Sequence, residues 1–177
     1  AVKKEFAARG AYILTRDEAR KVGNLILDGG RVSPKIVGQP AAKIAEMAGV
    51  KVPAATKALI GQATEIGPDK PFAHEKLSPI LGLFRAHDFA DGVKKSAALV
   101  ENGGLGHTAD LYTDPANADR IEAFWAAMKT GRVLINTPSS FGGIGDIYNF
   151  LLEPSLTLGG GSWGGNSVSE NAGVTQP

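Results

Sequence analysis

The 177-residue chain has the composition of a folded globular protein, with 43% hydrophobic and 21% charged residues. Its 19 Lys and Arg residues nearly balance its 18 Asp and Glu residues. The net charge of +1 therefore gives no electrostatic argument for binding nucleic acid or an anionic membrane. The chain has no cysteine, which excludes disulfides, thiolate metal ligands and a thiol nucleophile within it.

Further classes of site and location are also disfavoured. The three histidines, His74, His87 and His107, are far apart in the sequence, so we predict no metal site. No apolar run approaches the roughly 18–20 residues that cross a bilayer. The first residues, Ala-Val-Lys-Lys-Glu-Phe, are not a signal peptide and resemble the middle of a helix. We therefore expect the chain to be a piece of a longer protein.

Several sequence signals predict where helices begin. Residues 1–9 predict a helix that ends at Gly10. Thr15 and Glu18 have the spacing of a capping box, in which a hydroxyl and a carboxylate satisfy backbone N–H groups at a helix start. Proline or aspartate marks three further helix starts, at Pro40, Asp88 and Asp114-Pro115.

The helix after Asp114-Pro115 carries an apolar stripe. Ile121, Phe124, Trp125 and Met128 recur at intervals of three and four residues. This spacing places them on one side of a helix and predicts an amphipathic stripe.

Strand signals alternate with these helices. Short apolar segments predict strands at residues 11–14, 36–37, 57–66, 79–85 and 132–136, and one strand that ends at residues 111–113. This alternation favours an α/β fold with a mainly parallel sheet and helices on both faces. The predicted core takes side chains from both kinds of element: Val22, Ile26, Ile44, Leu59, Ile80, Leu83, Val93, Leu111, Ile121, Phe124 and Leu134.

The segment from Pro71 to Pro79 holds the most informative polar residues. His74, Glu75 and Lys76 lie between a proline-bounded turn and an apolar strand, where α/β proteins gather functional side chains. An imidazole such as that of His74 moves protons near neutral pH. The two oxygens of Glu75 can accept two hydrogen bonds from a vicinal diol such as a ribose. A solvated polar loop is the alternative interpretation.

The sequence leaves the roles of other positions open. Asn136 ends a predicted strand, which fits a binding site or an Asx turn equally well. His107 begins a strand and favours a structural role. The glycine runs at 142–145 and 159–161 favour tight turns over anion-binding loops. Trp163 fits either a pocket wall or a core position.

Five segments, in order along the chain, carry a family resemblance. They are Phe-Ala-His-Glu-Lys-Leu-Ser-Pro at 72–79, Ile-Asn-Thr-Pro-Ser-Ser at 135–140, Gly-Gly-Ile-Gly-Asp at 142–146, Pro-Ser-Leu-Thr-Leu-Gly at 154–159 and Ser-Trp-Gly-Gly-Asn-Ser at 162–167. Together they resemble the CoA-acylating aldehyde dehydrogenases, most closely the acetaldehyde dehydrogenase half of the bifunctional aldehyde–alcohol dehydrogenases. The resemblance covers essentially the whole chain.

The resemblance implies a position within a larger enzyme. In that family an NAD-binding Rossmann-type domain precedes a catalytic α/β domain, in which a cysteine attacks the aldehyde. Hydride passes to NAD, and CoA takes the acyl group from the resulting thioester. Residues 1–177 would be a segment of the catalytic domain just after that cysteine, lacking the nucleophile and the NAD-binding domain, with residues 159–177 as an irregular Gly- and Ser-rich tail.

Two departures at the end of the chain accompany the resemblance. The chain would stop before the family's last strand, which helps to pair subunits. Gly160 stands where relatives often carry a cysteine that is not the usual nucleophile. The second departure need not abolish the chemistry.

The resemblance also implies roles for individual residues. Glu75 resembles the residue that binds the nicotinamide ribose, and Leu77 the apolar residue beside the nicotinamide ring. His74 resembles a histidine near the thioester and is a candidate proton carrier. The remaining candidates lie on the substrate side: Asn136, Thr137, Ser139, Ser140 and Trp163, the last lining the aldehyde channel.

Two functional interpretations follow. The first is a catalytic-domain segment of an NAD-dependent enzyme that converts an aldehyde, CoA and NAD to acyl-CoA and NADH. It implies a small aldehyde substrate, CoA as co-substrate, an upstream NAD-binding domain as partner, and a homo-oligomeric parent in the cytoplasm or a bacterial microcompartment. Without a thiol, the chain alone is expected to be inactive. The second is a noncatalytic assembly or binding module that retains the fold.

Overall fold

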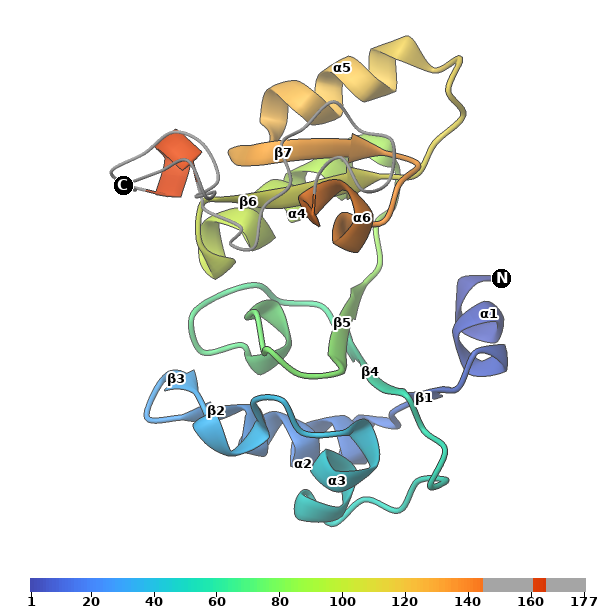
Figure 1. Ribbon diagram of the computed structural model, residues 1–177, viewed down its shortest axis with the longest axis vertical. Helices are drawn as coiled ribbons and strands as arrows, with labels where there is room; N and C mark the ends of the chain where they lie inside the picture. Colours follow the sequence, from blue (N-terminus) through green and yellow to red (C-terminus); the bar gives the residue numbers. More distant parts are fainter. Residues whose placement is uncertain (145–160, 165–177) are drawn as a thin grey trace. The chain divides into compact units, whose positions relative to one another are not determined.

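The computed structural model describes residues 1–144 and 161–164. The chain divides into two compact units, Ala1–Arg85 and Ala86–Pro177 (Figure 1). Each unit pairs its main strands in parallel and combines them with helices. The predicted α/β class with mainly parallel pairing is therefore confirmed.

The first unit is built on a three-stranded parallel sheet. Its strands are β1 (Ala11–Ile13), β4 (Ala58–Ala63) and β5 (Ile80–Phe84), in the order β1-β4-β5. The other elements of the unit are α1 (Val2–Ala8), α2 (Arg16–Ile26), the antiparallel hairpin of β2 (Leu27–Asp28) and β3 (Arg31–Val32), the 3-10 turn η1 (Pro34–Ile36), α3 (Ala41–Met47) and the 3-10 turn η2 (Pro71–Ala73).

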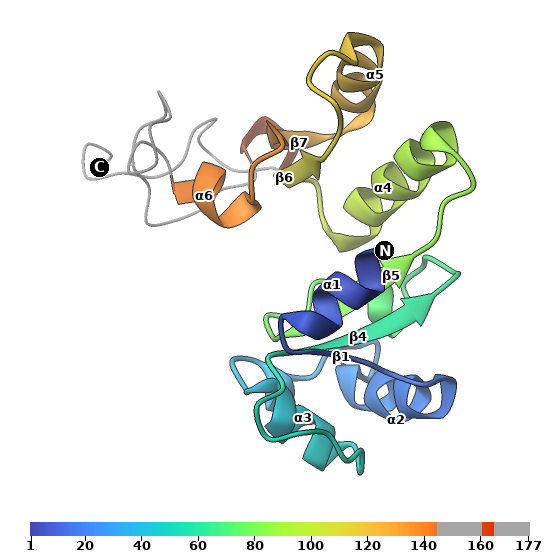
Figure 2. The same ribbon diagram turned by 90° about the vertical axis from the view of Figure 1, so that its right-hand side faces the viewer.

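The core of this unit lies between the sheet and two of its helices. Figure 2 shows α1 on one side of the sheet and α2 and α3 on the other. Ile26 on α2 and Ile44 on α3 are fully buried in one cluster with Leu59 on β4. Burying a side chain of this size stabilises a fold by about 1.5–3 kcal/mol. This layer therefore fixes the sheet that carries the loop between β4 and β5.

The predicted capping box at the start of α2 is present. The Glu18 N–H donates to Thr15 Oγ1 at 3.4 Å, and the Thr15 N–H donates to Glu18 Oε2 at 2.8 Å. The Tyr12 hydroxyl adds a hydrogen bond to Glu18 Oε1 at 3.0 Å. The backbone hydrogen bond from Thr15 is the main reason that the pKa of Glu18 is lowered. The box thus ties the end of β1 to the helix that follows it.

The second unit contains a parallel strand pair, β6 (Gly106–Leu111) and β7 (Thr130–Ile135). Figures 1 and 2 show α5 and α6 on opposite sides of this pair. The predicted cap at Asp88 is confirmed, because its Oδ1 accepts from the Asp91 N–H at 2.8 Å. The other elements are α4 (Phe89–Gly103), α5 (Ala118–Ala127), α6 (Ser139–Ile144) and the 3-10 turn η4 (Gly161–Gly164).

One predicted element and one predicted helix start are wrong. Ile36 and Val37 do not form a strand. Pro34 begins the turn η1, and Ile36 belongs to this turn and has its side chain buried. Asp114-Pro115 does not begin a helix. Asp114 Oδ1 accepts from the Ala116 N–H at 2.9 Å, which closes a local turn and delays α5 to Ala118.

The apolar stripe on α5 is only partly buried. Phe124 and Met128 are buried and Ile121 is half-buried, but the side chain of Trp125 is 68% exposed. Each residue turns the helix by about 100°, so Trp125 lies farther around the helix from Phe124 than Ile121 or Met128 does. Trp125 therefore lies at the exposed margin of the predicted stripe.

The predicted core is otherwise confirmed in outline. None of its eleven members is exposed, and four are half-buried: Leu83, Val93, Leu111 and Ile121.

Candidate functional site

The loop between β4 and β5 is seated on the sheet by an aromatic ring. Gly61 on β4 and Gly82 on β5 are register partners in the parallel pair. A Cβ added to Gly61 would lie 2.2 Å from Cε1 of Phe72, and one added to Gly82 would lie 2.4 Å from the Phe72 carbonyl oxygen. Both separations are far below van der Waals contact. The paired glycines therefore form the hollow that holds η2 against the sheet.

The side chain of Lys76 holds the next part of this loop by hydrogen bonds to its backbone. This side chain is buried, and Nζ donates to the Phe72 carbonyl at 3.2 Å and to the His74 carbonyl. Burial lowers the pKa of Lys76 to about 8, although the neighbouring Glu75 carboxylate acts in the opposite direction.

Glu75 and Leu77, the two residues predicted to contact a cofactor, both point to solvent. Glu75 is exposed, and no described residue donates a hydrogen bond to its carboxylate. The Leu77 side chain is 63% exposed, and its backbone has a φ of 47°, a conformation that a branched side chain adopts only when its surroundings impose it. The Leu77 carbonyl accepts from the Gly38 N–H at 2.9 Å, which helps to impose it.

The contacts of His74 define which of its ring nitrogens is available. Nε2 lies 2.9 Å from the Pro68 carbonyl oxygen. A carbonyl only accepts, so we assign the hydrogen to Nε2, which leaves the lone pair of the neutral ring on Nδ1. Nδ1 has no hydrogen-bond partner in residues 1–144 and 161–164. His74 thus presents one free basic nitrogen.

In the second unit, Asn136 uses its side chain to join two strand ends. Its Oδ1 accepts from the Thr113 N–H at 2.9 Å, and its Nδ2 donates to the Thr113 carbonyl at 2.8 Å. Its backbone lies at a φ of 53°, which Asn tolerates better than most residues. The Asn136 amide therefore adds two hydrogen bonds beyond the ends of β6 and β7.

The other predicted substrate-side residues divide into two groups. Thr137 Oγ1 donates to the Ile135 carbonyl at 3.2 Å, and Ser139 Oγ donates to the carboxylate of Asp110. Ser140 is exposed, and the Trp163 side chain on η4 is 51% exposed. Ser140 and Trp163 have no side-chain hydrogen-bond partner in residues 1–144 and 161–164, so they are the ones free to contact another molecule. Gly160 and the rest of the 159–177 tail, apart from 161–164, lie outside the described residues.

Comparison with known proteins identifies relatives over nearly the whole chain. No family model matches it. The bifunctional aldehyde-alcohol dehydrogenase AdhE of Escherichia coli K12 is 57% identical over 174 residues, which are 98% of this chain and 20% of that protein. The crystal structure of an acetylating aldehyde dehydrogenase from Geobacillus thermoglucosidasius matches 97% of this chain and 37% of that one, with 38% identity and a TM-score of 0.89. The chain is homologous to the acetylating aldehyde dehydrogenases.

A third relative is named for a different aldehyde. The propionaldehyde dehydrogenase from the Clostridium phytofermentans fucose utilisation bacterial microcompartment is 26% identical, covers 92% of this chain and 35% of that one, and has a TM-score of 0.74. The chain spans about a fifth of the length of the AdhE sequence. It therefore corresponds to part of the acetylating aldehyde dehydrogenase portion of such enzymes.

Two residues of this chain that had no predicted role hold its loops through side-chain contacts. Lys76 stands in the predicted segment but has no sequence signal for burial. Asp110 receives the Ser139 hydroxyl, while its Oδ1 is buried and has no hydrogen-bond partner in the described part of the chain. A glycine inside each of two predicted neighbouring strands, Gly61 and Gly82, is a sequence signal that could have located the Phe72 seat.

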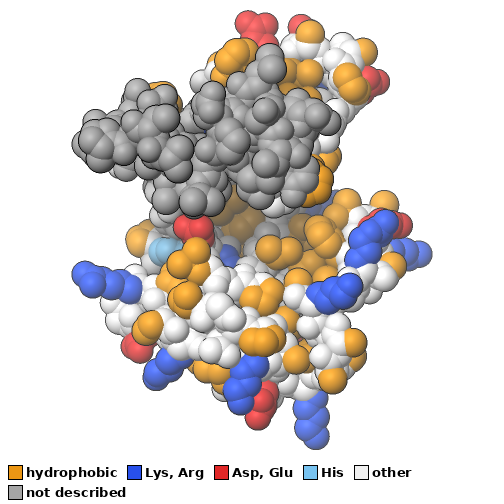
Figure 3. All heavy atoms as spheres, viewed as in Figure 1, with side chains coloured by type: hydrophobic (Ala, Val, Ile, Leu, Met, Phe, Trp, Pro, Cys, Tyr) orange, Lys and Arg blue, Asp and Glu red, His pale blue; other side chains and the backbone are white. Residues whose placement is uncertain are grey.

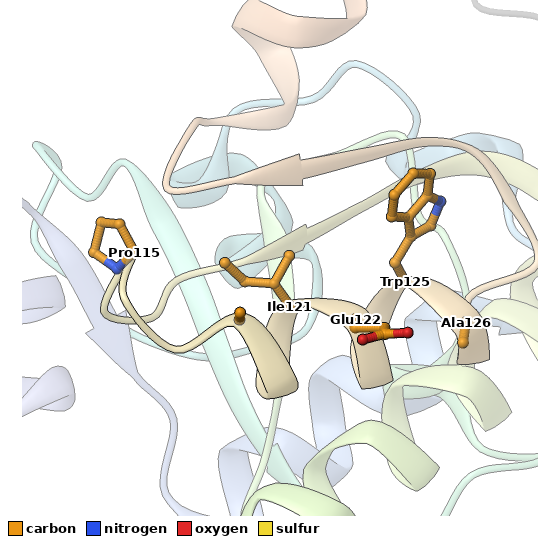
Figure 4. Close-up of a pocket in the computed structure, with 6 residues that line it drawn as sticks. Pro115, Ile121, Glu122, Trp125 and Ala126 are labelled. Carbon is orange, nitrogen blue, oxygen red and sulfur yellow. The ribbon is translucent and has the colours of Figure 1, made fainter.

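A groove on the second unit lies apart from these residues. It measures about 570 Å³ and is lined by Pro115, Ala118, Ile121, Glu122, Trp125 and Ala126. Figure 4 shows Ile121 and Trp125 on the same side of α5. None of the residues that the resemblance to acetylating aldehyde dehydrogenases selected lines it.

The described residues were also compared with the requirements of nucleic-acid, metal and membrane sites. On the face shown in Figure 3, Lys and Arg side chains are spread around the margin of the first unit. In residues 1–144 and 161–164, no three His, Asp or Glu side chains are grouped to hold a metal ion. No helix among them has both the length and the apolar character to cross a bilayer.

Proposed function

We propose that this chain is part of the catalytic domain of an NAD-dependent CoA-acylating aldehyde dehydrogenase. Homology to acetylating aldehyde dehydrogenases supports the enzyme class. The main support for the role of this chain is the loop at residues 71–78. This loop is anchored on its buried side, and it exposes a carboxylate that accepts no hydrogen bond from described residues next to an exposed apolar side chain.

The displayed pair fits the nicotinamide nucleoside of NAD. Both Glu75 oxygens are free of hydrogen bonds from described residues, so they can accept from the two ribose hydroxyls. Leu77, two residues further along the chain, offers an exposed apolar surface to the adjoining ring. When bound, NAD supplies the hydride acceptor of the reaction. Glu75 and Leu77 orient it, and neither takes part in a bond change.

His74 is proposed to move the proton of CoA. A thiol with a pKa near 8.5 is mostly protonated at pH 7 and must lose its proton before the sulfur can attack a thioester. The proton passes from that sulfur to Nδ1 of His74. The Nε2–H group keeps its hydrogen bond to the Pro68 carbonyl and stabilises the imidazolium that forms. The thioester itself requires a cysteine, which is not in this chain.

In the second unit, Ser140 and Trp163 are proposed to contact the aldehyde or the acyl group. Trp163 supplies a flat apolar surface suited to a short alkyl chain, and acetaldehyde is the substrate that the homology favours. Asn136, Thr137 and Ser139 are proposed to serve the substrate side indirectly, because their side chains already hold the strand ends.

The remaining parts of the proposal concern the whole enzyme. It would combine this chain with an NAD-binding domain and a cysteine nucleophile, form a homo-oligomer and act in the cytoplasm or a microcompartment. A noncatalytic module with the same fold is the second candidate, favoured by the lack of cysteine in this chain. The purified chain alone is expected to produce no NADH from acetaldehyde and CoA under either proposal.

Binding of NAD to the full-length protein that carries this segment separates the two candidates. Glu75→Gln removes the charge from a pair of hydrogen bonds worth about 1.5–3 kcal/mol. The NAD dissociation constant, measured by titration calorimetry, is expected to rise by about 10- to 100-fold. Glu65→Gln is the matched control, because Glu65 lies on the same loop but pairs with Lys70. An equal NAD affinity in Glu75→Gln and wild type would reject the proposed role.

A further inference from the structure

Lys76 is the only charged residue of the described chain that is buried, with 7% of its surface exposed. A buried ammonium group is costly unless oxygen atoms replace its water. Here the replacements are backbone carbonyl oxygens of Phe72 and His74. One belongs to η2 and the other follows it directly, so a single side chain binds the turn to the segment that leaves it.

The buried Lys76 lies between two exposed neighbours. Glu75 and Leu77 flank it in the chain and are both exposed, so the hydrogen bonds of Lys76 fix the backbone from which both side chains project. Leu77 is also held at a positive φ, with its carbonyl bonded to the Gly38 N–H. The loop therefore has one inward anchor between two outward side chains.

We propose that Lys76 is a positioning residue, which holds Glu75 and Leu77 in the orientation that receives the nicotinamide nucleoside of NAD. This inference rests on the proposed function of those two residues. It assigns to Lys76 no contact with the cofactor and no step in the reaction.

The chemistry of the site explains why a lysine stands there. A methionine of similar length would fill the same space without the desolvation that lowers the pKa of Lys76, but it could donate to neither carbonyl. The lysine thus gives up part of its solvation and supplies the two hydrogen bonds that close the loop. Lys70, on the same loop, is a contrast: it is partly exposed and pairs with Glu65 and Asp69.

The test compares Lys76→Met with Lys70→Met in the full-length protein. For Lys76→Met, we expect the dissociation constant and the KM for NAD to rise about tenfold, a change of about 1.4 kcal/mol. At saturating NAD, kcat should stay within about threefold of wild type, because the reacting groups are unchanged. Hydrogen–deuterium exchange should become faster at the backbone of residues 74–77. Lys70→Met should alter none of these quantities.

Lys76→Arg keeps a charged donor and provides a second variant if Lys76→Met does not fold. Its NAD affinity should stay within about threefold of wild type. An equal loss of affinity in both variants, or a loss of kcat without a change in KM for NAD, would overturn the assignment. If Glu75→Gln weakens NAD binding and Lys76→Met does not, the positioning role is wrong and the proposed function stands. If neither variant weakens it, both are wrong.

Discussion

The loop at residues 71–78 and the segment at residues 135–140 solve the same problem in opposite ways. The first leads into β5 and the second follows β7, and each must satisfy backbone groups that no strand pairs. In the first, Lys76 and Phe72 provide the anchoring, which leaves Glu75 and Leu77 free at the surface. In the second, the polar side chains nearest the strand end are themselves the anchors. A polar residue near a strand end is therefore available for binding only if a neighbour holds the backbone.

The largest expected effect concerns His74 on the loop at residues 71–78. His74→Ala in the full-length enzyme should lower CoA-dependent turnover by about 10²–10⁴-fold, because it removes the proton acceptor for the thiol. The initial burst of NADH, measured by rapid mixing, should remain, because hydride transfer precedes the attack of CoA. A lost burst together with weaker NAD binding would instead make His74 a loop anchor, like Asn136 in the second unit.

The seat of the same loop gives the next largest effect. Gly61→Ala places a methyl group inside the Phe72 ring and should lower the free energy of unfolding by about 1–3 kcal/mol. Gly92→Ala is the control. Gly92 lies within α4, and a Cβ there would make an ordinary contact of 3.6 Å with the Ala86 Cβ, so the change should stabilise by about 0.5–1 kcal/mol. Urea denaturation measures both. Equal stability of Gly61→Ala and wild type would mean that Phe72 does not occupy the hollow.

Asn136 tests the self-anchored segment. Asn136→Gly keeps a residue that accepts the positive φ but removes both side-chain hydrogen bonds to Thr113. It should destabilise the protein by about 1–2 kcal/mol. Ser140→Ala, four residues later at an exposed position, should change stability by less than about 0.5 kcal/mol. If the two variants are equally stable, the contrast between the two segments is wrong.

A further test of the loop at residues 71–78 is a pH dependence carried by Lys76. Its pKa is near 8 in the folded protein and near 10.5 when unfolded, so between these values the unfolded chain binds more protons. The contribution of Lys76 to stability should therefore rise with pH from about 8 to about 10. The difference in unfolding free energy between wild type and Lys76→Met, measured across this range, should change in favour of wild type. A constant difference would mean that the ammonium is not buried.

Local signals predicted the parts of the fold that local chemistry decides. The capping box of Thr15 and Glu18 and the cap at Asp88 need only neighbours in sequence, and both are present. Ile36 and Trp125 depended on what the rest of the chain packs against them, which no local pattern contains. The two loop residues given cofactor roles are exposed, as such roles require, but their tests remain to be made. The burial of Lys76 could not be predicted, because charged residues are rarely buried.

The hollow that holds Phe72 limits the order in which this sequence can change over generations. A side chain at position 61 or 82 collides with an aromatic ring or its backbone, whereas loss of the ring leaves only an unfilled space. The ring must therefore shrink before Gly61 can be replaced, whereas Gly82 is constrained by the Phe72 backbone whatever side chain stands at position 72. Reversal of such a path would require Gly61 to return before an aromatic residue could be regained. Positions 61 and 72 should accordingly vary as a pair among descendants of a common ancestor, and position 82 should stay glycine.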